Sequence, residues 1–245
     1  MHKKPIRALL LAAGFGSRLR PLTLKVPKCL IELNSKPILG YWLDKLEKLG
    51  CESVLINTHY LADQVNFFLK NRTNKKMHIE VVHENKLLGT AGTLISNADF
   101  FKDSNVLMIH ADNYTNADLK KFFNAYNLRP RGCFLTMLTF TTETPSNCGI
   151  VVTNNDGIVV DFYEKKANPP GNCANGAIYF FENSFINNIK SLNKSAFDFS
   201  KDVLPFYKGM INTWHTDKIF VDIGTPKALK DLEIYLSKEK FKQND

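Results

Sequence analysis

The stretch from residue 9 to residue 33, LLLAAGFGSRLRPLTLKVPKCLIEL, constrains the fold more than any other part of the chain. It continues an apolar run, residues 6–11, with the length and character of a buried parallel strand. Small residues, which let a backbone pass close to a ligand, follow at once: Ala12, Ala13, Gly14 and Gly16. The exposed N–H groups of such a turn can bind phosphate oxygens. Ser17, Arg18 and Lys28 add a hydroxyl group and two positive charges beside it.

This turn does not fit the two commonest phosphate-binding motifs. Leu19 stands where the dinucleotide fingerprint has its third glycine. No Gly-Lys-Ser/Thr follows, which excludes a Walker loop. Taken alone, the turn is as compatible with a tight strand-to-helix connection as with a ligand site.

Strands and helices alternate along the first half of the chain. Apolar residues recur at helical spacing over 38–49 and 60–70, and buried strands are predicted at 53–57, 78–83 and 105–110. This alternation predicts a parallel sheet covered by helices. For the second half we predict the following elements: a helix at 118–126, a strand at 133–140, a hairpin around 154–157, a strand at 172–181, helices at 185–191 and 198–207, a strand pair at 211–216 and 218–221, and a closing helix with Leu229, Leu232, Ile234 and Leu236 inward.

Composition excludes several classes of protein. The 245 residues are 44% hydrophobic and 23% charged, as in ordinary globular domains, and no apolar run is long enough to cross a bilayer. The short apolar run at the N-terminus ends in the glycine-rich turn rather than a cleavage site, so we expect a cytoplasmic protein. The five cysteines are dispersed, which argues against a zinc site or a disulfide framework. The net charge of +8 is spread out, and we expect no nucleic-acid or membrane partner.

Three further segments place chemistry at predicted strand ends. Residues 84–94, ENKLLGTAGTL, follow a strand, and ligands collect at the carboxyl ends of strands in open α/β sheets. Asp112 follows the strand at 105–110, where a carboxylate suits Mg²⁺. Asp222 precedes a helix that Thr225 and Pro226 begin correctly. Locally, each segment is also compatible with a plain loop or a capping residue.

The motifs together resemble the sugar-1-phosphate nucleotidylyltransferase family over nearly the whole chain. They are AAGFGSRLRPLT with PKCL, LGTAG, the hairpin ending in Glu164-Lys165, NGAIY at 175–179 and DIGTP at 222–226. The resemblance implies a three-layer α/β/α Rossmann-like nucleotidyltransferase fold with a mixed, mostly parallel central sheet. It implies one domain with a nucleotide-binding part (1–125), a sugar-phosphate-binding part (126–224) and a C-terminal helix and tail (225–245). It also implies an enzyme that forms an NDP-sugar and pyrophosphate from an NTP and a sugar 1-phosphate, its two partners.

The resemblance also assigns residues. The nucleotide is expected at Leu11, Ala12, Ala13, Gly14, Gly16, Ser17, Arg18, Lys28, Glu84, Gly89 and Thr90. The sugar phosphate is expected at Asn113, Gly149, Glu164, Lys165 and Asn175. Asp112 and Asp222 would bind the Mg²⁺ cofactor, and the catalytic residues would be Arg18, Lys28, Asp112 and Lys165. Lys166 stands where the family has proline, which leaves open whether Lys165 or Lys166 contacts the sugar phosphate.

The substrates are less constrained than the reaction. A Glu84 carboxylate can accept two hydrogen bonds from guanine, which favours GTP, whereas Ala13 is typical of uridylyl-transferring members. Mannose 1-phosphate is the first choice of sugar, ahead of a heptose, glucose or an amino sugar. The alternatives are uridylyl or thymidylyl transfer to another sugar, and a non-catalytic regulatory subunit that senses a nucleotide sugar. The sequence leaves the oligomeric state open and is compatible with a homodimer.

Overall fold

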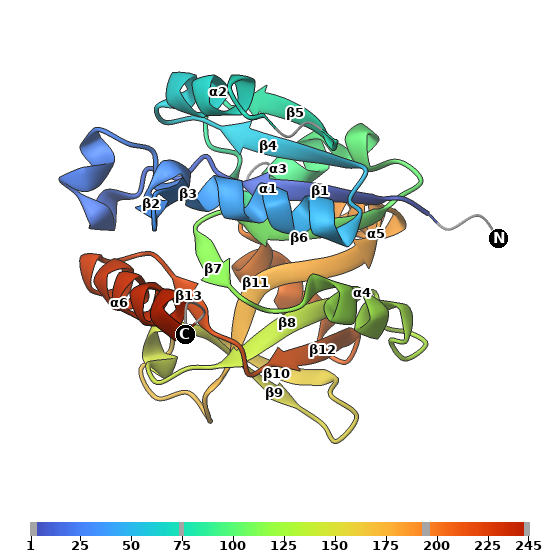
Figure 1. The fold of residues 1–245 in the computed structure, drawn as a ribbon. Coiled ribbons are helices and arrows are strands. Elements are labelled where there is room, and N and C mark those ends of the chain that lie inside the picture. The colour runs from blue at the N-terminus through green and yellow to red at the C-terminus, as the bar shows by residue number, and fades with distance from the viewer. Residues whose placement is uncertain (1–3, 74–75, 193–196, 243–245) are drawn as a thin grey trace.

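The structure is a computed structural model that describes residues 4–73, 76–192 and 197–242. Its centre is a nine-stranded mixed sheet with the order β10-β9-β11-β6-β1-β4-β5, in which β8 pairs with both β11 and β12 (Figure 1). The strands are β1 (Ile6–Leu11), β4 (Ser53–Thr58), β5 (His78–His83), β6 (Asn105–His110), β8 (Leu135–Thr141), β9 (Gly149–Thr153), β10 (Val159–Glu164), β11 (Cys173–Glu182) and β12 (Ile211–Thr216).

The first half of the chain forms the parallel part of this sheet, as predicted. β1 pairs in parallel with β6 and β4, and β4 pairs in parallel with β5. The strands β1, β4 and β6 are continuous apolar runs because helices cover both faces of the sheet. Their carboxyl ends therefore lie side by side, and the segments that leave them meet along one edge.

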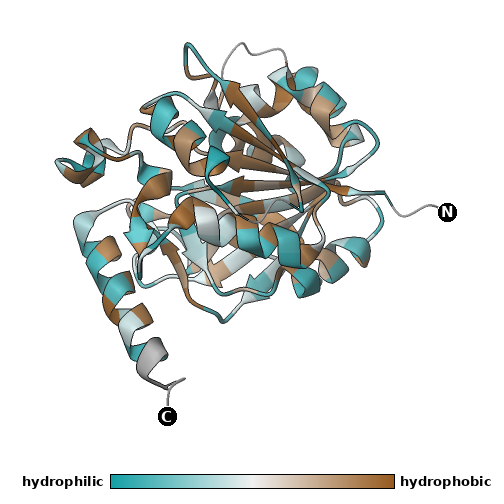
Figure 2. Ribbon diagram, turned by 45° about the horizontal axis from the view of Figure 1, so that its top comes forward, coloured by the Kyte–Doolittle hydropathy of each residue, from teal (hydrophilic) through white to brown (hydrophobic). Residues whose placement is uncertain are grey.

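In the described part of the chain, six α-helices and two hydrophobic cores make the three expected layers. One core contains side chains of α1 (Ile38–Leu49), α2 (Ala62–Lys70), α4 (Leu119–Asn127) and α6 (Pro226–Lys242), and the other contains those of α3 (Gly89–Ser96) and α5 (Ser184–Lys190). Figure 2 shows the hydrophobic strands in the middle and helices with one polar side. No described helix has both the length and the hydropathy needed to cross a membrane.

Several local predictions were wrong. The predicted helix at 198–207 is a π-helix (Phe199–Val203) followed by a 3-10 helix (Leu204–Tyr207), because Pro205 cannot continue a regular helix. The helix predicted from residue 60 begins at Ala62, since Leu61 has a left-handed conformation with φ 51. Ile234 is 45% exposed, whereas Leu232 and Leu236 are buried. The last residues of the C-terminal tail, 243–245, lie outside the described residues.

The predicted pairing of segments 211–216 and 218–221 was also wrong, and this error concerns the site. β12 instead joins β8 in parallel at the edge of the large sheet. The following strand, β13 (Phe220–Asp222), pairs with β7 (Asn113–Thr115), the strand that begins directly after Asp112. In this register Asp222 lies opposite Asn113. The small two-stranded sheet thus brings Asp222 to the end of β6.

The remaining short elements connect these layers. The loop after β1 contains three 3-10 helices, Ser17–Leu19, Leu22–Leu24 and Lys28–Leu30, and leads into the two-stranded sheet of β2 (Glu32–Leu33) and β3 (Lys36–Pro37). Two further 3-10 helices are Ala98–Phe101 and Pro145–Asn147. The hairpin of β9 and β10 turns around residues 154–157, as predicted, with Asn154 N–H bonded to the Ile158 carbonyl at 2.9 Å.

A bulge in β11 gives the first testable prediction. A Cβ on Gly176 would lie 2.8 Å from Leu138 Cδ2, whereas Ala177 already carries a Cβ at the left-handed φ of 52. We expect Gly176→Ala to destabilise the fold by about 1–3 kcal/mol through overpacking. Ala177→Gly should instead stabilise it by up to about 1 kcal/mol because it relieves the left-handed strain.

Chemical denaturation of the two variants measures both effects. Because the positions are adjacent, each variant controls for the other. A loss of stability in Ala177→Gly as large as that in Gly176→Ala would contradict this description of the bulge.

Candidate functional site

The loop after β1 is held against the neighbouring strand by a side chain. Ala12 N–H donates to Asn57 Oδ1 at the end of β4, with a distance of 2.7 Å. Gly16 has φ 63, and a Cβ there would lie 2.9 Å from Thr23 Cγ2. The Thr23 hydroxyl in turn donates to the Gly16 carbonyl at 2.8 Å. Gly16 is therefore required by both conformation and space, and the loop has a fixed shape.

Lys28 joins the two aspartates that the sequence singled out. Its Nζ bonds to Asp112 Oδ2 and lies 3.3 Å from Asp222 Oδ1. Arg18 NH2 lies 3.8 Å from Asp222 Oδ2. The Lys28 side chain is only 10% exposed, whereas those of Arg18 and Asp222 are 64% and 55% exposed. Four predicted residues from distant parts of the chain thus form one cluster of two cations and two carboxylates.

The charges in this cluster keep Asp112 ionised. Burial favours the neutral acid, but the positive charge of Lys28, a smaller influence of His110 and the hydrogen bond from Lys28 together lower the pKa of the Asp112 carboxyl. Asp112 is therefore an anion available to a cation at neutral pH.

The donor set of this cluster fits Mg²⁺. The carboxylates of Asp112 and Asp222 both contact the Lys28 ammonium, so they lie close enough together to share one cation. Within the described residues no group of three or more His, Cys, Asp or Glu side chains could hold a metal. Mg²⁺ is commonly held by one or two carboxylates, with substrate phosphates and water as its other ligands. These two aspartates would therefore suffice only together with a phosphate ligand.

Glu84 is buried and makes its hydrogen bonds within the protein. Its Oε1 accepts from Asn57 Nδ2 at 2.9 Å and from the Thr93 hydroxyl, and its Oε2 accepts from Leu88 N–H at 3.1 Å. Asn57 thus links Glu84 to Ala12 in the phosphate loop. This carboxylate organises the loop, and one of its oxygens has no free lone pair for a base.

A cavity of about 220 Å³ lies at this edge of the sheet. Of the predicted nucleotide-binding residues it contains Leu11, Ala13, Gly14, Glu84, Gly89 and Thr90, together with the predicted metal ligand Asp112. A Cβ on Gly14 would meet nothing within 4 Å, so the backbone there is open to a ligand. Polar groups converge on this cavity from the ends of β1, β4 and β6.

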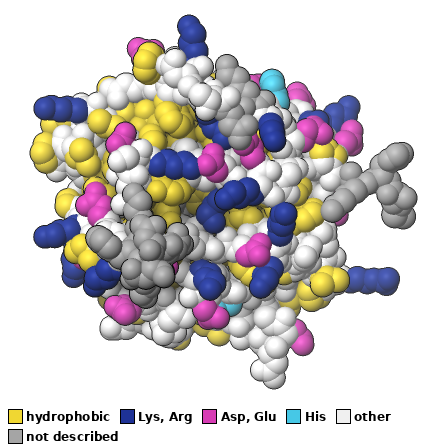
Figure 3. Space-filling model, in the orientation of Figure 1, with side chains coloured by type: hydrophobic (Ala, Val, Ile, Leu, Met, Phe, Trp, Pro, Cys, Tyr) yellow, Lys and Arg dark blue, Asp and Glu magenta, His cyan; other side chains and the backbone are white. Residues whose placement is uncertain are grey.

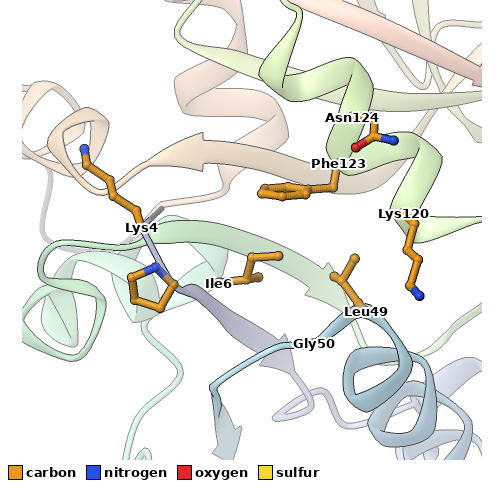
Figure 4. A pocket seen from close by; sticks show the side chains of 8 residues that line it. Lys4, Ile6, Leu49, Gly50, Lys120, Phe123 and Asn124 are labelled. Carbon is orange, nitrogen blue, oxygen red and sulfur yellow. The ribbon is translucent and has the colours of Figure 1, made fainter. Parts of the chain in front are cut away.

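A larger hollow, about 440 Å³, lies at the opposite edge of the sheet. Figure 4 shows that Ile6, Leu49 and Phe123 form its floor, while the Lys4 side chain extends away from them. Lys4 Nζ bonds instead to Glu182 Oε2 at 2.9 Å. Since polar groups do not converge there, the smaller cavity at the carboxyl ends is the better candidate site.

The residues predicted to bind the sugar phosphate lie on the second half of the sheet. The Glu164 carboxylate lies over Gly149, where a Cβ would be 2.6 Å from Oε2. Lys165 has a left-handed φ of 50, and its Nζ lies 3.9 Å from Glu164 Oε1. Such strain clusters at functional sites, although Leu61 and Ala177 of this protein have it as well. Burial raises the pKa of the Glu164 carboxyl, while Lys165 opposes this rise.

Two predicted sugar-binding amides have structural partners. Asn175 Oδ1 accepts from Ala177 N–H at 2.9 Å and its Nδ2 donates to the Tyr179 hydroxyl at 2.7 Å, which shapes the β11 bulge. Asn113 is buried and donates to the Gly176 carbonyl at 3.1 Å. Asn175 therefore stabilises the bulge within β11, and Asn113 connects β7 to that bulge.

A family-wide sequence profile described as nucleotidyl transferase matches residues 7–239. The chain belongs to the nucleotidyl transferase family. This confirms the resemblance to the sugar-1-phosphate nucleotidylyltransferases.

Individual relatives agree with this assignment. The chain is 33% identical to the mannose-1-phosphate guanylyltransferase catalytic subunit beta of Drosophila pseudoobscura pseudoobscura, over 97% of this chain and 64% of that protein. It is 31% identical to the mannose-1-phosphate guanyltransferase of Schizosaccharomyces pombe, over 95% of this chain and 65% of that protein. The chain thus spans just under two thirds of the length of these relatives.

Solved structures share the fold. A Bacillus anthracis protein assigned provisionally as a glucose-1-phosphate thymidylyltransferase, in complex with a sucrose, superposes with a TM-score of 0.84 at 21% identity, over 94% of each chain. HddC from Yersinia pseudotuberculosis, complexed with GMP-PN, has a TM-score of 0.79 at 23% identity, over 94% of this chain and 99% of that chain. The three-layer fold expected from the sequence is therefore confirmed.

Sequence reasoning did not assign several residues of the candidate site. Asn57, Leu87, Thr93 and His110 also line the cavity. The sequence did contain an indication for Asn57, because it is a polar residue directly after the apolar residues of β4. Burial raises the pKa of Cys148 and raises that of Cys29 to about 12, which disfavours the thiolate form of both.

Charged side chains of both signs are mixed on the side of the molecule shown in Figure 3. Figure 3 shows lysine and arginine side chains interspersed with aspartate and glutamate over the side seen in Figure 1. Non-specific nucleic-acid binding depends on clustered cations. This side of the molecule therefore offers no continuous basic stripe to such a partner.

Proposed function

We propose that the protein transfers a nucleotidyl group from an NTP to a sugar 1-phosphate and releases pyrophosphate. The observation that carries this proposal is the cluster in which Lys28 joins Asp112 and Asp222 beside Arg18. A sugar-phosphate oxygen attacks the α-phosphorus as its bond to the pyrophosphate oxygen breaks. Since the nucleophile is already an anion, the protein has to position two anions and stabilise charge rather than remove a proton.

Each cation has a distinct role in this reaction. Arg18, which is largely exposed, holds the pyrophosphate leaving group, and Lys28 neutralises the α-phosphate. Lys165 holds the sugar phosphate in preference to Lys166, a choice supported by its strained backbone next to Glu164. Asp112 and Asp222 would hold Mg²⁺, which would supply positive charge to stabilise the negative charge of the reacting phosphates.

The chain divides its substrates between the two halves of one sheet. Residues 1–125 contribute the cavity at the ends of β1, β4 and β6 and hold the nucleotide. Residues 126–224 contribute Gly149, Glu164 and Lys165 and hold the sugar phosphate. Residues 225–245 form the closing helix and tail.

GTP and mannose 1-phosphate are the proposed substrates. The names of the two relatives described above support this pair. Ala13, which lines the cavity, keeps uridylyl transfer as the alternative. A non-catalytic sensor is disfavoured because the arginine, the lysines and both aspartates are all present.

The test is pyrophosphate release with Mg²⁺, with each NTP and dTTP measured against a panel of sugar 1-phosphates. Release with GTP and mannose 1-phosphate alone is the expected result. Release with UTP would make Ala13 the better guide. Absence of release from folded protein that still binds a nucleotide would favour the sensor.

Glu84→Gln distinguishes a base-reading role from an organising one. The Glu84 carboxylate accepts three hydrogen bonds from protein donors, and an amide nitrogen in place of one oxygen cannot accept. We therefore expect KM to rise about tenfold for whichever NTPs the protein uses, with the preference among bases unchanged. Steady-state kinetics with each accepted NTP measures this.

Asn57→Ala is the matched variant, because it breaks the same link between Glu84 and Ala12 without touching the carboxylate. It should reproduce the effect of Glu84→Gln. A loss confined to GTP in Glu84→Gln, with Asn57→Ala unaffected, would instead show that Glu84 reads guanine.

A further inference from the structure

His110 has a buried nitrogen that no described residue satisfies. Its Nε2 is inaccessible to water, and among the described residues it has no hydrogen-bond partner. Buried polar groups are almost always paired, so a lone one at a cavity calls for a partner from outside the protein. His110 lines the cavity at the carboxyl ends of the strands.

The position of His110 indicates which substrate supplies that partner. It is the last residue of β6, opposite Leu11 of β1, and β6 pairs on its other side with β11 through Ile109 and Ile178. β1 leads into the phosphate loop, whereas β11 belongs to the half that carries Glu164 and Lys165. His110 therefore lies at the boundary between the two halves.

We propose that His110 Nε2 forms a hydrogen bond with a hydroxyl group of the bound sugar 1-phosphate and so helps to determine which sugar is accepted. A hydroxyl both donates and accepts, so it can pair with Nε2 in either neutral tautomer of the ring. This inference rests on the proposed function, since it assigns a further residue to the same site.

A binding measurement tests the proposal without requiring turnover. In protein labelled with ¹⁵N-histidine, mannose 1-phosphate should shift the Nε2 resonance of His110, whereas GTP alone should not. The resonance is assigned by its absence in His110→Phe. No shift with mannose 1-phosphate or with any other sugar 1-phosphate of the panel would overturn the proposal, whereas a shift without catalysis would overturn only the proposed reaction.

Steady-state kinetics of His110 variants provide a second test of the proposal. His110→Phe keeps the ring volume but removes both nitrogens, and we expect KM for the sugar 1-phosphate to rise about tenfold, with kcat and KM for the NTP little changed. His110→Gln, which restores an amide near the position of Nε2, should recover part of the loss. His78→Asn, at the amino end of edge strand β5, is the control for replacing a histidine.

Two kinetic results would overturn the assignment. A rise in KM for the NTP alone would place the contact on the ribose. A loss of kcat that His110→Gln does not recover would indicate a purely structural role.

Discussion

Asp112→Asn should lower kcat by about three orders of magnitude while leaving the fold intact. The expected loss follows from removing one of the two carboxylates that fit Mg²⁺, since a metal ion at a transferring phosphoryl group stabilises charge by several kcal/mol. The fold should survive because asparagine has the same shape, and because the Asp112 carbonyl that accepts from Ile223 N–H at 3.1 Å is unchanged. Steady-state kinetics at saturating substrates and thermal unfolding together measure both parts.

The control is an aspartate outside the cluster. Asp63 is exposed in the first turn of α2, so Asp63→Asn removes the same charge from the protein surface. It should leave kcat unchanged. Manganese binding measured by electron paramagnetic resonance gives an independent readout, and it should weaken only in Asp112→Asn. Unchanged turnover in Asp112→Asn would remove this residue from the metal site.

The parts of the fold that sequence predicted best are those that short-range patterns determine. The strands at 78–83 and 105–110 have the predicted boundaries. Burial on both faces demands the apolar run at 105–110, whereas the exposed edge strand at 78–83 is recognised by its β-branched residues between two polar ends. Gly50 ends α1 at φ 83, as glycine does at many helix ends. The tight turn at Gly16, where φ is 63, was likewise predictable from the local glycine-rich sequence.

What sequence could not predict depends on contacts between distant segments. Nothing near Asp222 indicates that its strand pairs with β7 rather than with β12, and only the family resemblance placed it beside Asp112. Glu84 and Asn175 have residue types that suit a ligand, yet their hydrogen bonds go to Leu88 N–H, Ala177 N–H and other protein groups that only the folded structure brings near. Residue type suggests what a side chain can bind, and packing decides what it does bind.

Lys28→Met is expected to lower both turnover and stability, with Mg²⁺ restoring part of the stability. Turnover should fall about 10²–10³-fold, because the α-phosphate loses its buried cation. Stability should fall by about 1–2 kcal/mol, less than for a fully buried pair, because Asp222 is 55% exposed and water screens its charge. Methionine keeps most of the side-chain volume of lysine, so packing changes little.

The effect of Mg²⁺ on Tm distinguishes two explanations of a destabilised Lys28→Met variant: Lys28 and Mg²⁺ share the two aspartates, or the variant has only lost packing. In Lys28→Met the two carboxylates face each other without their ammonium, so a divalent cation should bind them more tightly in the absence of NTP. A ligand that binds only the folded state raises Tm by an amount that grows with its affinity, so Mg²⁺ should raise the Tm of the variant more than that of the original protein. Equal shifts in the two proteins would mean that Lys28 and Mg²⁺ do not share the two aspartates.

The contribution of the Lys28–Asp112 ion pair to stability should depend on pH. Lys28 lowers the pKa of Asp112 in the folded state, so the ion pair contributes its full stability above the unfolded-state pKa, about 3.9, and loses it as the pH falls through the lower folded-state value. The difference in unfolding free energy between the original protein and Lys28→Met should therefore be constant near neutral pH and shrink below about pH 4. A difference that persists in acid would come from packing rather than charge, and Lys28 would then be a structural residue rather than the cation that meets the α-phosphate.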